Sequence, residues 1–187
     1  MAHFEHDGCS LHYEEYGQGP PLLLLHGLGS SCRDWEYQIP VLAEQYRVIA
    51  MDMRGHGRSD KPRERYSIRG FAGDVEALIE HLNLGPVHVV GLSMGGMIGF
   101  QLAVDQPHLL KSLCIVNSAP QVKIQSAYDV WQYAKRWGLA RLLSMETLGK
   151  AIGRNLFPKP EQDDLRRKIA SRWVENDKRA YLASFNA

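Results

Sequence analysis

Residues 87–100, VHVVGLSMGGMIGF, place a run of β-branched residues directly before a glycine cluster with one serine at its centre, followed by an apolar stretch. The β-branched run predicts a buried strand, and the apolar stretch after it predicts a helix. A strand that passes into a helix within a few residues needs a sharp turn, which glycine permits. The segment therefore predicts a strand–turn–helix unit, which restricts the fold to a sheet whose strands alternate with helices.

The neighbouring stretches repeat this alternation. Residues 20–27, PPLLLLHG, form an unbroken apolar run, which is typical of a strand covered on both faces of a sheet. Helices are expected over 67–85 and from 94 to just before Pro107, where apolar residues recur at helical spacing. The expected strands are 11–17 as an early edge strand, 20–27, 46–52, 87–93 and 111–118. The predicted fold class is α/β, with a mostly parallel sheet and helices on both of its faces.

After Asn117 the sequence changes to helical patterns with no strand-like stretch. We therefore predict two parts, an α/β core over 1–118 and a helical segment over 119–187. Large aromatic residues of the second part could line a substrate cavity, but they more often pack helices together. These residues are Trp131, Tyr133, Trp137 and Trp173.

The charge balance excludes some classes of partner. The chain has 22 Lys and Arg against 21 Asp and Glu, a formal net charge of +1, which points neither to nucleic acid nor to an anionic membrane. No apolar run is long enough to span a bilayer, and the N-terminus lacks the basic and apolar regions of a signal peptide. A cytoplasmic protein with a small-molecule partner is expected.

The cysteines indicate neither a disulfide framework nor a zinc site. Cys9, Cys32 and Cys114 are odd in number, widely separated and without metal-ligand spacing. Cys114, within SLCIV, is expected to be a buried strand residue. No metal and no organic cofactor is implied.

Ser93 lies in Gly91-Leu92-Ser93-Met94-Gly95, which matches the pattern G-x-S-x-G. At a sharp strand-to-helix turn the serine hydroxyl projects above the sheet, at a helix N-terminus whose free amides favour a developing negative charge. The alternative is that Ser93 only caps the helix. A cap does not require glycine at both 91 and 95, so we identify Ser93 as a candidate nucleophile.

A second glycine motif, His26-Gly27-Leu28-Gly29, directly follows the LLLL strand and leaves the same end of the parallel sheet. Acyl transfer passes through an oxyanion that backbone N–H groups stabilise. The expected donors are the amides of Leu28 and Met94.

These motifs together resemble the N-terminal part of an α/β-hydrolase-fold serine hydrolase. The resemblance rests on LLLLHGLGSS, MDMRGHGRSD and VHVVGLSMGG, and it extends to a helical insertion after LCIVNSAP, which is the cap in that family. The chain is similar to carboxylesterases, enol-lactonases such as 3-oxoadipate enol-lactonase, and cofactor-free haloperoxidases. Serine at the turn counts against haloalkane dehalogenases and epoxide hydrolases. The resemblance implies an acyl-enzyme on Ser93, esters or lactones of small apolar acyl groups as substrates, and a structural role for the loop 52–60.

The family requires an acid and then a histidine after the serine. The only histidine after Ser93 is His108, about fifteen residues along the expected helix and so roughly 20 Å away. Asn117 stands where some relatives keep the acid, and an amide carries no charge. We therefore expect 1–187 to be an N-terminal portion, inactive alone, whose acid and histidine come from beyond residue 187, either in a longer form of the chain or in a complementary chain. The alternative is a non-catalytic binding module or a truncated fragment that acts through a partner chain.

Overall fold

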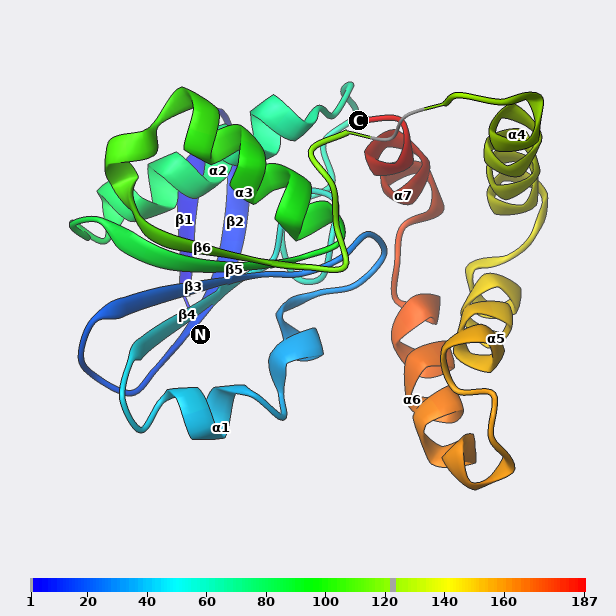
Figure 1. Cartoon of the computed structure of the whole chain (residues 1–187), viewed down its shortest axis with the longest axis horizontal. Helices are drawn as coiled ribbons and strands as arrows, with labels where there is room; N and C mark the ends of the chain where they lie inside the picture. Colours follow the sequence, from blue (N-terminus) through cyan, green and yellow to red (C-terminus); the bar gives the residue numbers. More distant parts are fainter. Residues whose placement is uncertain (1, 122–123) are drawn as a thin grey trace.

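A computed structural model describes residues 2–121 and 124–187. Its centre is a six-stranded sheet with the order β1-β2-β4-β3-β5-β6 (Figure 1). Strands β4, β3, β5 and β6 run parallel, and β1 and β2 are antiparallel to their neighbours. The strands are β1 (Ala2–His6), β2 (Cys9–Tyr16), β3 (Pro21–Leu25), β4 (Arg47–Met51), β5 (Val87–Leu92) and β6 (Leu110–Val116).

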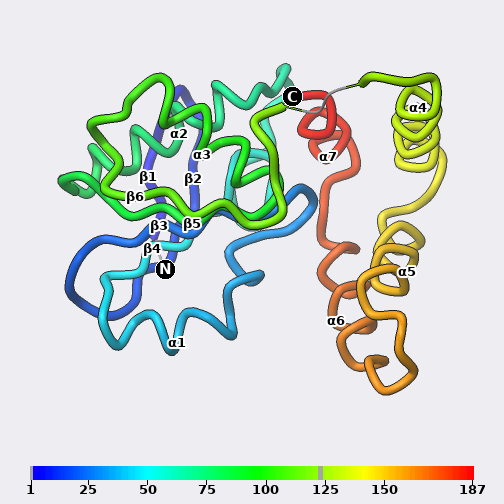
Figure 2. The backbone as a smooth tube through the Cα atoms, in the orientation of Figure 1, coloured from blue at the N-terminus to red at the C-terminus, as the bar shows by residue number. Residues whose placement is uncertain are grey.

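Helices cover the two faces of the sheet unequally. Two long helices, α2 (Ile68–His81) and α3 (Met94–Asp105), lie on one face, and the short α1 (Ile39–Leu42) lies on the other (Figures 1 and 2). Two 3₁₀ turns, η1 (Cys32–Trp35) and η2 (Pro107–Leu109), precede α1 and follow α3. The predicted α/β class is confirmed.

The LLLL run is explained by this double cover. Leu23 and Leu25 pack with the core beneath α2 and α3, whereas Leu22 and Leu24 pack with Trp35 and its neighbours on the opposite face. Since successive side chains of a strand point to opposite faces, a strand covered on both must be apolar at every position.

The edge assignment at the N-terminus was wrong. The expected strand near 11–17 is β2, but β1 pairs with it and is the outer strand on that side. The hairpin turns at Asp7 and Gly8, whose φ angles are 48° and 68°. An Asp-Gly pair is a strong signal for this type of tight turn, so the sequence does contain the information for β1.

The other edge of the sheet is β6, which pairs with β5 and with no other strand of the described residues. The expectation that Cys114 is buried was wrong, because its side chain is exposed on this strand. Burial of the strand's outward face needs an element beyond β6, and the described part of the chain places none there.

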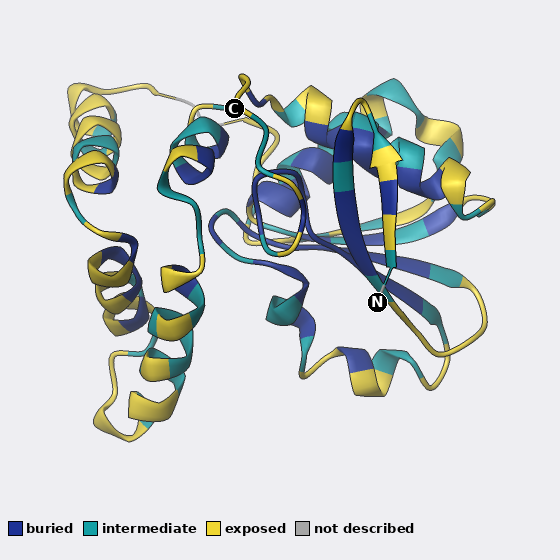
Figure 3. Ribbon diagram, turned by 180° about the vertical axis from the view of Figure 1, so that it is seen from behind, coloured by how far each residue is buried: buried dark blue, intermediate teal, exposed yellow. Residues whose placement is uncertain are grey.

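Helices without strands make up the described residues 124–187 (Figure 1). They are α4 (Ala127–Leu142), α5 (Met145–Leu156), η3 (Pro160–Gln162), α6 (Asp163–Val174) and α7 (Lys178–Phe185). Trp173 is buried in their core and packs against Tyr181, with ring centroids 5.3 Å apart. In contrast, α4 is exposed over most of its surface (Figure 3), and Ala140 is its buried residue.

Polar contacts tie these helices to the sheet part. The Asn176 amide donates to the carbonyl of Gly29 at 2.8 Å, and Arg179 donates to the carbonyl of Lys61 at 2.6 Å. Arg33 also pairs with Glu175. Within the described ranges, none of the helices is both long and apolar enough to pass through a bilayer.

Candidate active site

Ser93 connects β5 to α3 in a backbone conformation that is rare for a residue with a side chain. Its φ and ψ are 51° and −111°, and its side chain is exposed. Such a conformation costs on the order of 1–3 kcal/mol and persists only where the surrounding fold enforces it. Although Ser93 occupies the N-cap position, its hydroxyl makes no capping hydrogen bond. The capping interpretation is therefore wrong, and the hydroxyl is free.

The two glycines of the motif are required by close backbone approach. A Cβ atom at Gly91 would collide with the carbonyl oxygen of Gly95, and one at Gly95 would collide with the carbonyl oxygen of Leu25. The amide of Gly95 donates to the carbonyl of His26 at 3.1 Å. The backbones of β3, β5 and the start of α3 thus approach one another too closely for a side chain at either Gly91 or Gly95.

The second glycine motif lies against Ser93. A Cβ atom on Gly27 would be 3.7 Å from the Cβ of Ser93, and Gly29 has a φ of 74°. His26 is fully buried: its Nδ1 donates to the carbonyl of Gly27 at 2.8 Å, and its Nε2 accepts from the amide of Met53 at 3.0 Å. Because both ring nitrogens are used, His26 shapes this loop and is not available as a base.

The expected oxyanion donors share one cavity with Ser93. Leu28 and Met94 both line it, and its volume is about 490 Å³. Met94 is the first residue of α3, so no carbonyl of its own helix accepts its amide hydrogen. The amide of Leu28 has no acceptor among the described residues. The site thus contains one free hydroxyl and two unpaired amides.

The far side of the cavity comes from the helical segment. Tyr133 and Arg136 of α4 line it together with Phe185 at the end of α7. Tyr133 packs against Phe185 with the rings tilted by 35° and their centroids 5.2 Å apart, and its hydroxyl donates to Asn186 Oδ1 at 3.1 Å. Of the two roles open to these aromatic residues, Trp173 packs helices together, whereas Tyr133 both packs against α7 and lines the cavity.

A base and an acid are missing from this cavity. Among the described residues that line it, none is His, Asp or Glu. His108 lies in η2, beyond the far end of α3, and is exposed. Asn117 has a φ of 47° and lies beside Ser118, whose hydroxyl donates to the carbonyl of Ser93 at 2.6 Å. The residues after β6 thus support the turn at Ser93 but offer no proton acceptor.

The loop 52–60 is a structural corner, as expected. Asp52 accepts the amides of Cys32 and Arg58 at 2.6 and 2.9 Å. Arg54 forms a bidentate pair with the fully buried Asp74, which raises the pKa of the arginine. Burial lowers the pKa of His56 to about 3, so this imidazole stays neutral.

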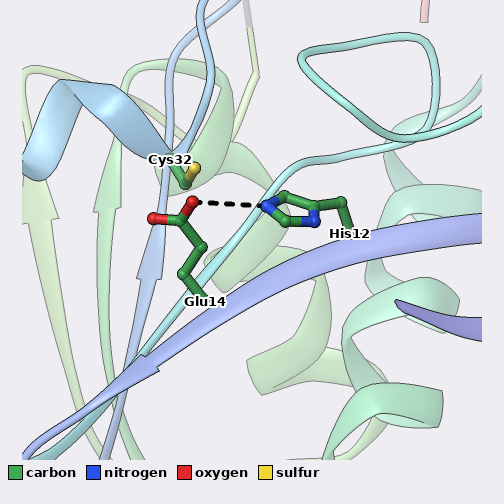
Figure 4. A group of neighbouring side chains, drawn as sticks. All are labelled: His12, Glu14 and Cys32. Atoms are coloured by element: carbon green, nitrogen blue, oxygen red, sulfur yellow. Dashed lines mark hydrogen bonds and ion pairs between the residues drawn. The ribbon is translucent and has the colours of Figure 1, made fainter. Parts of the chain in front are cut away.

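A cluster outside the cavity has metal-ligand residue types but a different role. Figure 4 shows His12 and Glu14 of β2 next to Cys32 at the start of η1, with their ligand atoms within 4.8 Å of one another. Arg58 Nη1 lies 2.7 Å from Glu14 Oε1 and 3.3 Å from His12 Nε2, so a guanidinium already supplies the positive charge. Burial raises the pKa of the Cys32 thiol well above its ordinary value, which disfavours the thiolate that a metal requires. Tyr16 completes the network by donating to Glu14 at 2.6 Å.

Comparison with known proteins agrees with this geometry. Residues 20–147 match the family described as alpha/beta hydrolase fold. The chain is 42% identical over 114 residues to a soluble epoxide hydrolase of Corynebacterium sp. (strain C12), an alignment that covers 61% of this chain and 40% of the relative. It is 39% identical over 106 residues to the (E)-2-((N-methylformamido)methylene)succinate hydrolase of Acinetobacter baylyi, covering 57% of this chain and 40% of the relative.

Solved structures match over nearly the whole chain. The enol-lactonase from Burkholderia xenovorans LB400 superposes with a TM-score of 0.88 at 26% identity, covering all of this chain and 72% of that protein. An esterase from Exiguobacterium antarcticum gives 0.84 at 27% identity, covering 97% and 70%. The chain thus spans about seven tenths of these structures and 40% of the curated relatives. On its sequence match, its sheet order and its strand–serine–helix turn, the chain belongs to the alpha/beta hydrolase fold family.

Proposed function

We propose that Ser93 is the nucleophile of a serine hydrolase that acts on esters or lactones of small acyl groups. The observation that carries the proposal is the free hydroxyl of Ser93, in a strained turn, in one cavity with the unpaired amides of Leu28 and Met94. Enzymes of acyl transfer need this combination of a nucleophile and two N–H donors for the oxyanion.

In the proposed reaction, Ser93 Oγ attacks the substrate carbonyl, and its proton passes to a general base. The carbonyl oxygen becomes an oxyanion that accepts hydrogen bonds from the amides of Leu28 and Met94. Collapse of this intermediate expels the alcohol with a proton and leaves an acyl group on Ser93. Water then attacks the acyl-enzyme and releases the acid and the free serine.

The base and its acid would come from polypeptide outside 1–187, either in a complementary chain or in a longer form of this one. The cavity supplies neither group from the described residues, and the open edge of β6 offers backbone hydrogen bonds to a further strand. We expect purified 1–187 to hydrolyse p-nitrophenyl butyrate at close to the uncatalysed rate. Normal esterase turnover by this chain alone would contradict that part of the proposal.

Serine chemistry distinguishes this proposal from epoxide opening. The Corynebacterium relative is named an epoxide hydrolase, but the hydroxyl of Ser93 is the type of nucleophile used in acyl transfer. The enol-lactonase and the esterase with the same fold act, by name, on lactones and esters. We further propose a cytoplasmic location, which the three free cysteines support.

The test is acyl-enzyme trapping in the protein together with its complementing polypeptide. Ser93→Ala is expected to reduce ester turnover by about 10³-fold or more and to abolish the acyl adduct in rapid-quench mass spectrometry. Ser184→Ala is the matched control, because Ser184 lines the same cavity while its hydroxyl donates to the carbonyl of Ala180 at 3.0 Å. Turnover that survives Ser93→Ala would disprove the assignment.

A second candidate is a binding module that keeps the cavity without turnover. The absence of His, Asp and Glu from the described cavity lining favours it. The same experiment separates the two functions: no acyl adduct, in the chain alone or with any accompanying polypeptide, would support the binding module.

A further inference from the structure

One charged side chain lines the cavity at Ser93. The other described lining residues have apolar or uncharged polar side chains at neutral pH, and the charged one is the guanidinium of Arg136 on α4. Arg136 forms no ion pair with any acid of the described residues. Some other arginines of the helical segment are paired, such as Arg172 with Glu36 and Arg166 with Asp163, both at 2.8 Å. Among the described residues, Arg136 is therefore a positive charge without an acidic partner, on the wall of the cavity that Ser93 also lines.

Packing against an aromatic ring holds the Arg136 guanidinium in position. The Cζ atom of Arg136 lies 5.5 Å from the centroid of the Phe185 ring, and Phe185 in turn packs against Tyr133. A guanidinium that packs on an aromatic face keeps its N–H groups in the plane of the fork, free to donate. The α4 and α7 helices, labelled in Figure 1, contact each other. Their packing thus holds a planar donor on the cavity wall.

We infer that the ester or lactone bound here carries a carboxylate, which Arg136 recognises while Ser93 faces the acyl carbon. The inference rests on the proposed function and narrows its substrate class from neutral esters to acyl groups with a terminal acid, such as half-esters of short dicarboxylic acids. A carboxylate matches the two parallel N–H groups of the fork. Its single negative charge also balances the single positive charge, whereas a phosphate group would leave excess negative charge in a largely apolar cavity.

Direct binding tests the inference without requiring turnover. The probes are monomethyl glutarate and its neutral amide analogue, methyl 4-carbamoylbutanoate, which have nearly the same shape. Binding of each to the chain 1–187 carrying Ser93→Ala is measured by isothermal titration calorimetry, at low and at high salt. The acid is expected to bind about tenfold more tightly than the amide, with the preference reduced at high salt because Arg136 is exposed.

Two variants assign the preference to one side chain. Arg136→Gln is expected to bind the acid and the amide equally, and Arg136→Lys to restore part of the preference, since lysine keeps the charge without the fork. Arg141→Gln is the matched control: Arg141 lies on the same helix over Trp137, outside the cavity lining, and its loss should leave the preference unchanged.

Three results would overturn the inference: equal binding of acid and amide, a preference that survives Arg136→Gln, or no binding of the acid at about 10 mM. Failure of the proposed function would look different. In that case the acid would still bind more tightly than the amide in a manner that depends on Arg136, while no acyl adduct would form on Ser93 in the completed protein.

Discussion

At the scale of single residues, the strain at Ser93 links fold and chemistry. The φ of 51° and ψ of −111° hold the serine between β5 and α3, and the Ser118 hydroxyl and the amides of Gly96 and Met97 all bond to its carbonyl. These contacts fix the turn whatever side chain position 93 carries. The surrounding fold therefore imposes the conformation, and any residue with a side chain at position 93 is strained by it.

Replacing Ser93 tests this stored strain. Ser93→Gly is expected to unfold with a free energy about 1 kcal/mol higher than Ser93→Ala, because glycine adopts this conformation without steric cost, which outweighs its larger unfolded-state entropy. Both variants lack the hydroxyl, so the comparison isolates the backbone. Urea denaturation followed by circular dichroism provides the measurement. A glycine variant less stable than the alanine variant would show that the turn is unstrained.

His56 makes stability depend on pH. Its pKa is about 3 in the folded protein, chiefly because burial disfavours the charged ring, against 6.5 for an unperturbed histidine. Between these values the unfolded chain binds a proton that the folded chain does not, so stability falls as pH falls from about 6.5 toward 3. Burial lowers the pKa of His12 as well, which acts in the same direction.

His56→Asn is expected to remove part of this dependence. The slope of unfolding free energy against pH between pH 6 and 4 should decrease by up to about 1.4 kcal/mol per pH unit, the value for one proton. Urea titrations at several pH values measure the slope. The control is His108→Asn, since His108 is exposed. Equal slopes in wild type and His56→Asn would contradict the assignment.

At the scale of elements, close packing of β3, β5 and α3 places the candidate site. Gly95→Ala is expected to destabilise the protein by about 2–3 kcal/mol, because its Cβ collides with the carbonyl of Leu25 and the helix must move. Gly138→Ala is the control, because Gly138 lies within α4 with open space around it. Alanine there should increase the free energy of unfolding by up to about 1 kcal/mol. Thermal unfolding of both variants measures the contrast. Equal shifts would mean that the glycine motif is not a packing requirement.

The same scale explains which elements the sequence could predict. The run LLLL and the segment around Ser93 are local patterns that the fold must satisfy, so β3, β5 and α3 were predicted near their observed bounds. Strand β1 was missed although Asp7 and Gly8 mark its turn, because a strand of five residues shows little periodic pattern by itself. The free hydroxyl of Ser93 could be expected from its flanking glycines, whereas Tyr133 and Arg136 enter the cavity only through the packing of α4 on α7. No local pattern encodes that packing.

At the scale of the whole molecule, the open edge of β6 is the feature with the largest consequence. Ile115 is half-buried, and Cys114 and Val116 are exposed, so backbone groups and apolar side chains face outward together. Such an edge is a template for a further strand. The open edge supports the prediction of a complementing polypeptide. The cytoplasmic location and the division into two parts at residue 118 also stay predictions.

Self-association of 1–187 through that edge is therefore expected at high concentration. Val116→Lys should lower the association constant by about tenfold, since a charge on an edge strand opposes strand pairing. Val104→Lys is the matched control: Val104 is 77% exposed and lies on α3, so it is not part of the edge strand. Sedimentation velocity over a range of concentrations measures the effect. Equal association of the two variants would place the contact elsewhere.

The central claim is that the turn between β5 and α3 presents a reactive serine. Its most direct test is to treat the protein, isolated with any polypeptide bound to it, with an alkyl fluorophosphonate and to locate the adduct by peptide mapping. We expect one phosphonate, on Ser93, and none in Ser93→Ala. Ester hydrolysis by a sample in which Ser93 stays unmodified by the probe would contradict the claim.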